Sequence, residues 1–78
     1  MQAVNLVFTV YDRVAEEASP PFIARNKAAA IRMYLNSIKG LAPSDYWLYR
    51  IGAFNLDTME LTAVYKPERV MISEGEEE

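Results

Sequence analysis

The sequence has 78 residues, enough for one small domain with a single helix layer on one sheet, and it contains neither cysteine nor histidine. These missing residue types exclude disulfides, thiol and imidazole catalysis and the usual zinc ligands, and they suit an intracellular protein. No apolar run approaches the roughly 20 residues of a membrane span, and Met1 is not followed by the basic region of a signal peptide, so we expect neither membrane insertion nor secretion.

The net charge of −3 is unevenly distributed along the chain. Four of the eleven acids lie in the last five residues, which leaves seven acids against eight bases, a net charge of +1, for residues 1–73. A terminal charge run of this kind is usually solvated, so we predict a single domain over residues 1–72 followed by an acidic disordered tail over residues 73–78. A second interpretation is that the tail competes with nucleic acid for a basic surface.

Residues 3–11 (AVNLVFTVY) alternate between two faces and predict the first strand. One of these faces is fully apolar and consists of Val4, Leu6, Phe8 and Val10. The charged, alanine-rich segment 12–19 is predicted to be a loop. Pro20 and Pro21 cannot lie inside a helix, so Phe22–Arg25 is predicted to be a short edge strand, where the missing proline donors do least harm.

An amphipathic helix is predicted from about Asn26 to Lys39, because Asn26 is a good cap and Gly40 ends a run of helix formers. The larger apolar side chains recur at the i, i+3, i+4, i+7 spacing: Ile31, Tyr34, Leu35 and Ile38. This stripe is predicted to pack on the sheet. The remaining surface of this region is basic and carries no acid, which is usual for a solvated face but also suits contacts with phosphates: Arg25, Lys27, Arg32 and Lys39.

The loop Gly40–Asp45 leads to the second strong strand, which is predicted over Tyr46–Phe54 (YWLYRIGAF). Strict alternation places Trp47, Tyr49, Ile51 and Ala53 on one face, and Tyr46, Leu48, Arg50 and Phe54 on the other. Both faces are largely apolar, so either Gly52 marks a bulge that changes the parity or the second face is covered. A hairpin turn over residues 55–59 then connects this strand to Glu60–Tyr65.

Lys66 and Pro67 are predicted to end the last strand, and Arg69–Ile72 could add a short final one. Together these elements predict an α+β fold, in which a small antiparallel β-sheet packs against one amphipathic α-helix. One helix cannot cover both apolar faces of the second strand, so we expect a homodimer or a higher oligomer. Trp47 or Phe54 is expected near the contact, depending on the parity at Gly52.

The sequence shows no constellation of residues that is typical of an enzyme. Asp12, Glu16 and Glu17 lie close together, but carboxylates in a charged loop usually face solvent. The serines have no histidine to activate them, and the three glycines do not form a phosphate-cradling loop. We therefore predict that the protein is not an enzyme, and that it has no catalytic residue, no metal site and no cofactor.

Aromatic residues surround a cation on the second strand, where Tyr46, Trp47, Tyr49 and Phe54 flank Arg50. Aromatic rings beside a cation on a sheet are a common way to hold single-stranded nucleic acid. Core packing combined with a dimer interface requires the same residue types, so the pattern alone leaves both interpretations open.

A series of short motifs runs through the chain: Tyr11-Asp12, Ala15-Glu16, Pro20-Pro21-Phe22, Ala24-Arg25, Ala30-Ile31-Arg32, Asp45-Tyr46, Leu48-Tyr49, Ile51-Gly52 and Phe54. This series resembles the small nonstructural protein of gokushoviruses, in the single-stranded DNA phage family Microviridae, over about residues 8–70. The chain departs from that pattern at Met59, where a glycine usually closes the hairpin. It also has a shorter connection between helix and strand, which makes the loop at residues 40–45 compact.

The resemblance implies a protein of the bacterial host's cytoplasm that acts early in phage DNA replication. It implies binding of single-stranded DNA, or help in the switch from duplex replication to genome packaging, and it supplies no catalytic residue. The predicted nucleic-acid-binding residues are Arg25, Lys27, Arg32, Lys39, Tyr46, Trp47, Arg50 and Phe54. The alternative function is that of a dimeric adaptor acting on phage or host replication, assembly or capsid proteins.

Overall fold

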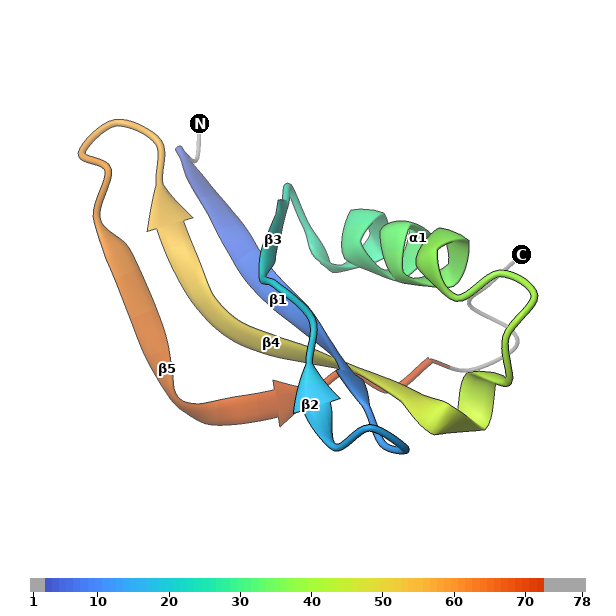
Figure 1. The fold of residues 1–78 in the computed structure, drawn as a ribbon. Coiled ribbons are helices and arrows are strands. Elements are labelled where there is room, and N and C mark those ends of the chain that lie inside the picture. Colours follow the sequence, from blue (N-terminus) through green and yellow to red (C-terminus); the bar gives the residue numbers. More distant parts are fainter. Residues whose placement is uncertain (1–2, 73–78) are drawn as a thin grey trace.

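The computed structural model describes residues 3–72, which form an antiparallel β-sheet and one α-helix (Figure 1). The acidic tail predicted over residues 73–78 lies outside the described residues. The elements in chain order are β1 (Val4–Asp12), β2 (Glu17–Ala18), β3 (Phe22–Ala24), α1 (Lys27–Ser37), the 3₁₀ turn η1 (Pro43–Asp45), β4 (Tyr46–Asn55) and β5 (Leu61–Arg69). The α+β class predicted from the sequence is confirmed.

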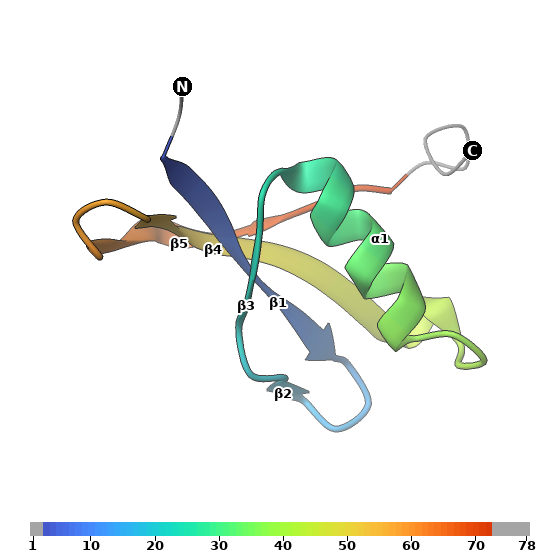
Figure 2. The ribbon, with the colours of Figure 1, turned by 90° about the horizontal axis from the view of Figure 1, so that it is seen from above.

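The strands follow the order β2-β1-β4-β5, and β3 pairs with β1 on the same edge as β2. The sheet is curled into a half-barrel rather than a flat layer, and β5 bends sharply along its length (Figure 1). Helix α1 packs on one face of this sheet, at the end away from the β4–β5 hairpin (Figure 2). The face under α1 is called the helix face here, and the opposite one the open face.

Helix α1 begins where the sequence predicts. The side chain of Asn26 accepts a hydrogen bond of 2.8 Å from the backbone N–H of Ala29, so it satisfies one of the free donors of the first turn. The predicted stripe faces the sheet, with Tyr34 and Ile38 buried and with Ile31 and Leu35 half-buried against the core. The helix ends at Ser37, two residues earlier than predicted.

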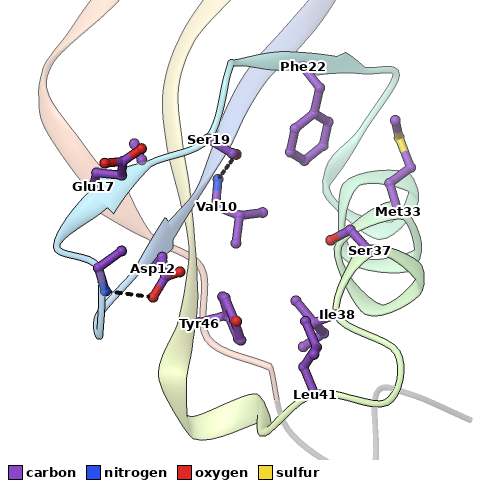
Figure 3. A pocket seen from close by; sticks show the side chains of 12 residues that line it. Val10, Asp12, Glu17, Ser19, Phe22, Met33, Ser37, Ile38, Leu41 and Tyr46 are labelled. Carbon is purple, nitrogen blue, oxygen red and sulfur yellow. Dashed lines mark hydrogen bonds between the residues drawn. The ribbon is translucent and has the colours of Figure 1, made fainter.

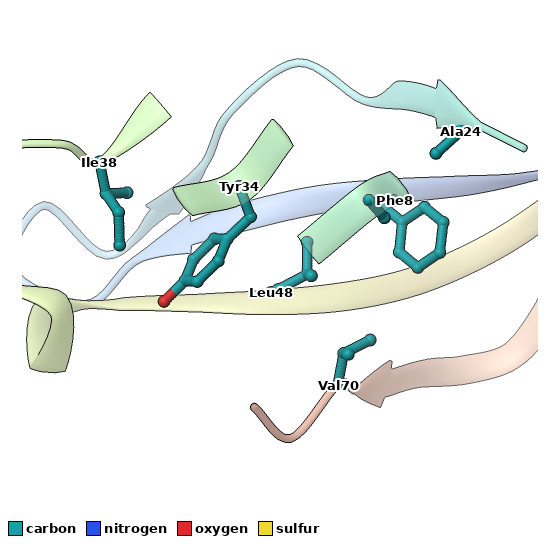
Figure 4. Close-up of a cluster of buried hydrophobic side chains, with 7 residues drawn as sticks. Phe8, Ala24, Tyr34, Ile38, Leu48 and Val70 are labelled. Atoms are coloured by element: carbon teal, nitrogen blue, oxygen red, sulfur yellow. The ribbon is translucent and has the colours of Figure 1, made fainter. Parts of the chain in front are cut away.

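The core lies between α1 and the helix face (Figure 4). Phe8 of β1 and Leu48 of β4 are its largest fully buried side chains, with 0% and 1% of their surface exposed. The other buried members are Ala24, Ala30, Tyr34, Ile38 and Val70. The hydroxyl of Tyr34 donates a 2.7 Å hydrogen bond to the carbonyl oxygen of Tyr46, which ties the helix to the start of β4.

The register of β1 and β4 shows how β4 can be apolar on both of its faces. Val10 pairs with Leu48, and Leu6 pairs with Ala53, but the register shifts between these pairs because Ile51 is an extra residue on β4. Beyond this bulge the parity is reversed, so Ala53 lies on the helix face and Phe54 on the open face. Strict alternation therefore assigned the faces wrongly after the bulge, and the bulge beside Gly52 is confirmed.

Two further segments differ from the prediction. The segment 12–19 is not all loop, because the carboxylate of Asp12 accepts hydrogen bonds from the backbone N–H groups of Val14 and Ala15 and so forms a tight turn into β2. The last strand does not end at Lys66 and Pro67 but continues to Arg69. Proline is tolerated there because β5 lies at the edge of the sheet, where one side of the strand needs no donor.

Candidate nucleic-acid interface

The open face carries a row of aromatic rings on β1 and β4. Tyr11 is paired with Trp47, and the ring of Tyr49 lies in edge contact with both, at centroid distances of 6.4 Å. Phe54 lies on the same face, farther along β4 and beyond the bulge. These rings are only partly buried, so the open face presents an aromatic surface that α1 does not cover.

The basic residues predicted around the helix lie on the other side of the sheet. Arg25, Lys27, Arg32 and Lys39 are all exposed. Each belongs to α1 or to the residues next to it, whereas Trp47 points away from the helix. The structure therefore does not bring these cations together with Trp47 and Phe54 on one surface, because the sheet lies between them.

The other two predicted residues have local partners. Tyr46 lies on the helix face and packs against the core, and its carbonyl oxygen accepts the hydrogen bond from Tyr34. The guanidinium of Arg50 forms an ion pair of 3.0 Å with Glu68 on β5. A half-exposed ion pair of this type contributes little to stability. It does place the carboxylate of Glu68 beside Arg50, the cation that the sequence analysis grouped with the aromatic residues of this strand.

Two arginines that the sequence analysis did not select lie on Trp47 instead. The guanidinium carbon of Arg13 is 4.3 Å from the centroid of the indole ring, and that of Arg69 is 3.8 Å away. Arg13 is also held by hydrogen bonds of 2.8 Å, one from its side chain to the carbonyl of Ser44 and one from its backbone N–H to Asp45. The sequence does not indicate this cluster, because Arg13 lies in a segment predicted to be a loop and Arg69 lies after the predicted end of the last strand. The cluster forms because β4 pairs with β1 on one side and with β5 on the other.

A pocket of about 470 Å³ opens on the opposite side, between α1, β1 and the β2–β3 segment (Figure 3). Its walls are mainly apolar and include Val10, Phe22, Met33, Ile38 and Leu41. Two acidic residues, Asp12 and Glu17, also line it. An apolar group that carries a neighbouring positive charge fits this chemistry, whereas a phosphate would be repelled.

The free edge of the sheet at β5 is a third exposed surface. Residues 61–65 (LTAVY) carry no charge, and Leu61 and Tyr65 are 69% and 100% exposed. An edge strand in a monomer is usually protected by charged residues or proline, and here Lys66 and Pro67 come only after the apolar stretch. The edge is therefore open to pairing with another strand.

Residues 3–72 contain no group of three or more His, Cys, Asp or Glu side chains that could hold a metal ion. Within the same residues, no helix has both the length and the apolar character required to cross a membrane.

Comparison with known proteins places the chain in a family. Neither a curated protein nor a solved structure matches it. A family model described as Phage ORF5 protein matches residues 5–77, which include nearly all of the described fold and the whole of the open face. The chain therefore belongs to the Phage ORF5 protein family and is a bacteriophage protein.

Proposed function

We propose that this phage protein binds single-stranded DNA and catalyses no reaction. It acts in the cytoplasm of the bacterial host, during genome replication or the switch to packaging, as an early protein of the gokushoviruses in the Microviridae. The observation that carries the proposal is the open face, where aromatic rings lie beside cations on a curved sheet. Such surfaces suit single strands because every base can stack on a ring while cations contact the backbone.

The basic side chains around α1 have a supporting role in this proposal. Within residues 3–72, none of Arg25, Lys27, Arg32 and Lys39 makes a cation–π contact, so they attract the phosphate backbone through charge. Binding of this kind is independent of base sequence and weakens steeply with salt. The predicted aromatic residues Trp47 and Phe54 lie on the open face, where the stacking contacts are expected.

Titration of the full chain with a fluorescently labelled oligothymidylate at two salt concentrations tests this function. We expect the affinity to fall as the salt concentration rises. In a plot of log affinity against log salt concentration, each phosphate contact to a single strand should steepen the slope by about 0.7. Deleting Glu74–Glu78 should tighten binding at low salt and change little at high salt, because the acidic tail competes for the same cations and salt screens this competition.

The double variant R32A/K39A is the matched test of the helix surface. It should weaken binding without loss of folding, because both side chains are exposed and surface changes usually cost little stability. If the full-length and the tail-deleted proteins both fail to bind the oligonucleotide at low salt, the function proposed here is wrong.

In that case an adaptor function is the second candidate, and the pocket in Figure 3 favours it. Its apolar walls and its acidic residues Asp12 and Glu17 would receive an apolar side chain with a neighbouring lysine or arginine. Such a segment would belong to a phage or host replication, assembly or capsid protein. This interaction would not depend on the acidic tail in the way expected for DNA.

The homodimer expected from the sequence is proposed to form through the free edge of β5. Leu61 and Tyr65 are equally distant from Ala63, so a two-fold axis at Ala63 places each Leu61 beside the partner's Tyr65 in an antiparallel pair. No charges oppose one another in this stretch. Phe54 is paired with Leu61 and so lies one strand from the contact, whereas Trp47 lies farther from it.

A63C provides a direct test of this dimer, because the chain has no other cysteine. Under mild oxidation we expect the variant to form a disulfide-linked dimer on a non-reducing gel, since the two sulfurs meet at the axis. A28C, which introduces the same change on the exposed surface of α1, serves as the control and should crosslink much more slowly. Equal crosslinking of both variants, together with a monomer in light scattering at high micromolar concentration, would show that β5 does not pair with itself.

A further inference from the structure

Trp47 is the centre of a cluster of two cations and one ring. Arg13 follows β1 and Arg69 ends β5, so the two guanidiniums reach the indole from the strands on both sides of β4. At distances of 4.3 Å and 3.8 Å both are close enough for cation–π contact. The indole is therefore already stacked with protein groups, and it holds the two arginines in place rather than offering an open surface to a base.

Neither arginine of the cluster forms an ion pair with an acid among the described residues. The single ion pair among residues 3–72 joins Arg50 and Glu68, and neither Arg13 nor Arg69 has a carboxylate partner there. Asp12 directs its carboxylate to the backbone of the turn into β2. The hydrogen bond from Arg13 to a carbonyl orients its guanidinium but does not neutralise it. Two like charges around one ring repel each other, so the site favours an anion that contacts both.

The spacing of the two guanidiniums suits a phosphate. Their central carbons each lie close to the ring centroid, so they are no more than about 8 Å apart. A phosphorus atom sits on the order of 4 Å from a guanidinium carbon when charge-assisted N–H···O bonds of normal length connect them. A phosphate that bridges Arg13 and Arg69 lies at the edge of the indole, and the two exposed arginine side chains turn toward it from the ring. Guanidiniums are the preferred groups for this type of recognition.

A hollow adjoins the cluster and offers room for the rest of a nucleotide. Its volume is about 440 Å³, within the range of pockets that hold small ligands. Both arginines and Trp47 line one end of it, and Leu35 of α1 and Leu48 of the helix face line the other, so the hollow leads from the cluster toward the helix side of the sheet. Tyr49, in edge contact with Trp47, is the neighbouring ring on the open face.

We infer that Arg13 and Arg69, oriented by Trp47, form a phosphate-binding subsite that takes one backbone phosphodiester of a single strand. The inference rests on the proposed DNA-binding function and places its strongest phosphate contact on the open face rather than on α1. It also assigns Trp47 a positioning role and leaves base stacking to neighbouring rings such as Tyr49.

Trp47 is the only tryptophan of the chain, so its fluorescence reports on this subsite alone. Titration of the full protein with unlabelled oligothymidylate at low salt should change the emission as the phosphate engages the two guanidiniums. R13Q/R69Q should bind at least about tenfold more weakly, since hydrogen bonds to charged groups contribute strongly. Its log-log salt slope should be shallower by about 1.4, which corresponds to two lost phosphate contacts.

R32Q/K39Q is the matched control, because it removes the same amount of charge from exposed positions on the other side of the sheet. It should lower affinity less and should leave the change in Trp47 emission intact. The single variant R69Q, which changes an exposed position on the edge strand, is titrated in the same way, and circular dichroism checks that each variant is folded. R69Q keeps the test valid if the double variant is unfolded. Its plot of log affinity against log salt concentration should have a slope shallower by about 0.7.

The outcomes separate this inference from the proposed function. Oligonucleotide binding that is equally tight in R13Q/R69Q and the unchanged protein overturns the subsite and leaves the DNA-binding function standing. A second outcome is that inorganic phosphate or pyrophosphate changes the Trp47 emission while no oligonucleotide binds. This result would show an anion site for free phosphate, and it would overturn both the phosphodiester assignment and the proposed DNA-binding function. No response to any of these probes overturns both.

Discussion

Replacing Phe8 by alanine is expected to lower the free energy of unfolding by about 3–5 kcal/mol, the range for deleting a buried aromatic ring. The side chain is 0% exposed, and its ring stacks on Phe22 at a centroid distance of 5.9 Å. It also lies in the cluster that joins β1 to the helix and to Leu48. Because small domains have net stabilities of only about 5–15 kcal/mol, this single change removes a large share of the total.

Urea denaturation followed by circular dichroism measures the effect, with V14A as the control. Val14 is 75% exposed in the turn between β1 and β2, so its truncation should change the free energy of unfolding by no more than about 0.5 kcal/mol. Similar stabilities for F8A and V14A would mean that the core is not organised around Phe8.

Replacing Gly52 by alanine is expected to destabilise the β4–β5 hairpin and to cost about 1–3 kcal/mol of global stability, as overpacking does. A Cβ atom on Gly52 would lie 2.5 Å from the carbonyl oxygen of Thr62, which is backbone of the neighbouring strand and cannot rotate away. The strands must separate to accept it. Gly52 also adjoins the bulge that turns Phe54 to the open face, so the aromatic surface should be disturbed as well.

Amide hydrogen exchange locates this effect. In G52A the protection of residues 61–63 should fall more than that of β1, because the collision is with β5. Gly40 provides the matched control, since a Cβ there meets nothing within 4 Å. Its φ of 83° strains any side chain, but asparagine tolerates this conformation best, so G40N should cost less than G52A and leave exchange in β5 unchanged. Unchanged exchange in β5 of G52A would contradict the close approach of the two strands.

The turn between β4 and β5 contains Met59 at the position where the resemblance leads us to expect a glycine. Met59 has a φ of 68° at the end of the β4–β5 turn, a conformation that favours glycine. The turn is stabilised by Asn55, whose side chain accepts hydrogen bonds from the N–H groups of Asp57 and Thr58. The hairpin therefore closes here without the expected glycine.

Several features of this protein follow from the sequence by itself, because they depend on residues close together in the chain. The stripe containing Tyr34 and Ile38 identifies the buried side of α1, and the alternation around Phe8 identifies β1, since helix and strand periodicities are local. Asn26 marks the start of the helix for the same reason. The absence of cysteine and histidine excludes thiol and imidazole chemistry without any structure.

The tertiary structure alone decided which side chains meet. The extra residue Ile51 reverses the faces of β4 only in relation to β1, so alternation within one strand could not place Phe54 on the open face. Arg13 and Arg69 are far apart in sequence and converge on Trp47 because β1 and β5 flank β4, a pairing fixed by contacts between distant segments. Periodicity along a chain determines which side of its own element a residue occupies, whereas register, bulges and strand order determine its neighbours, and the candidate site depends on those neighbours.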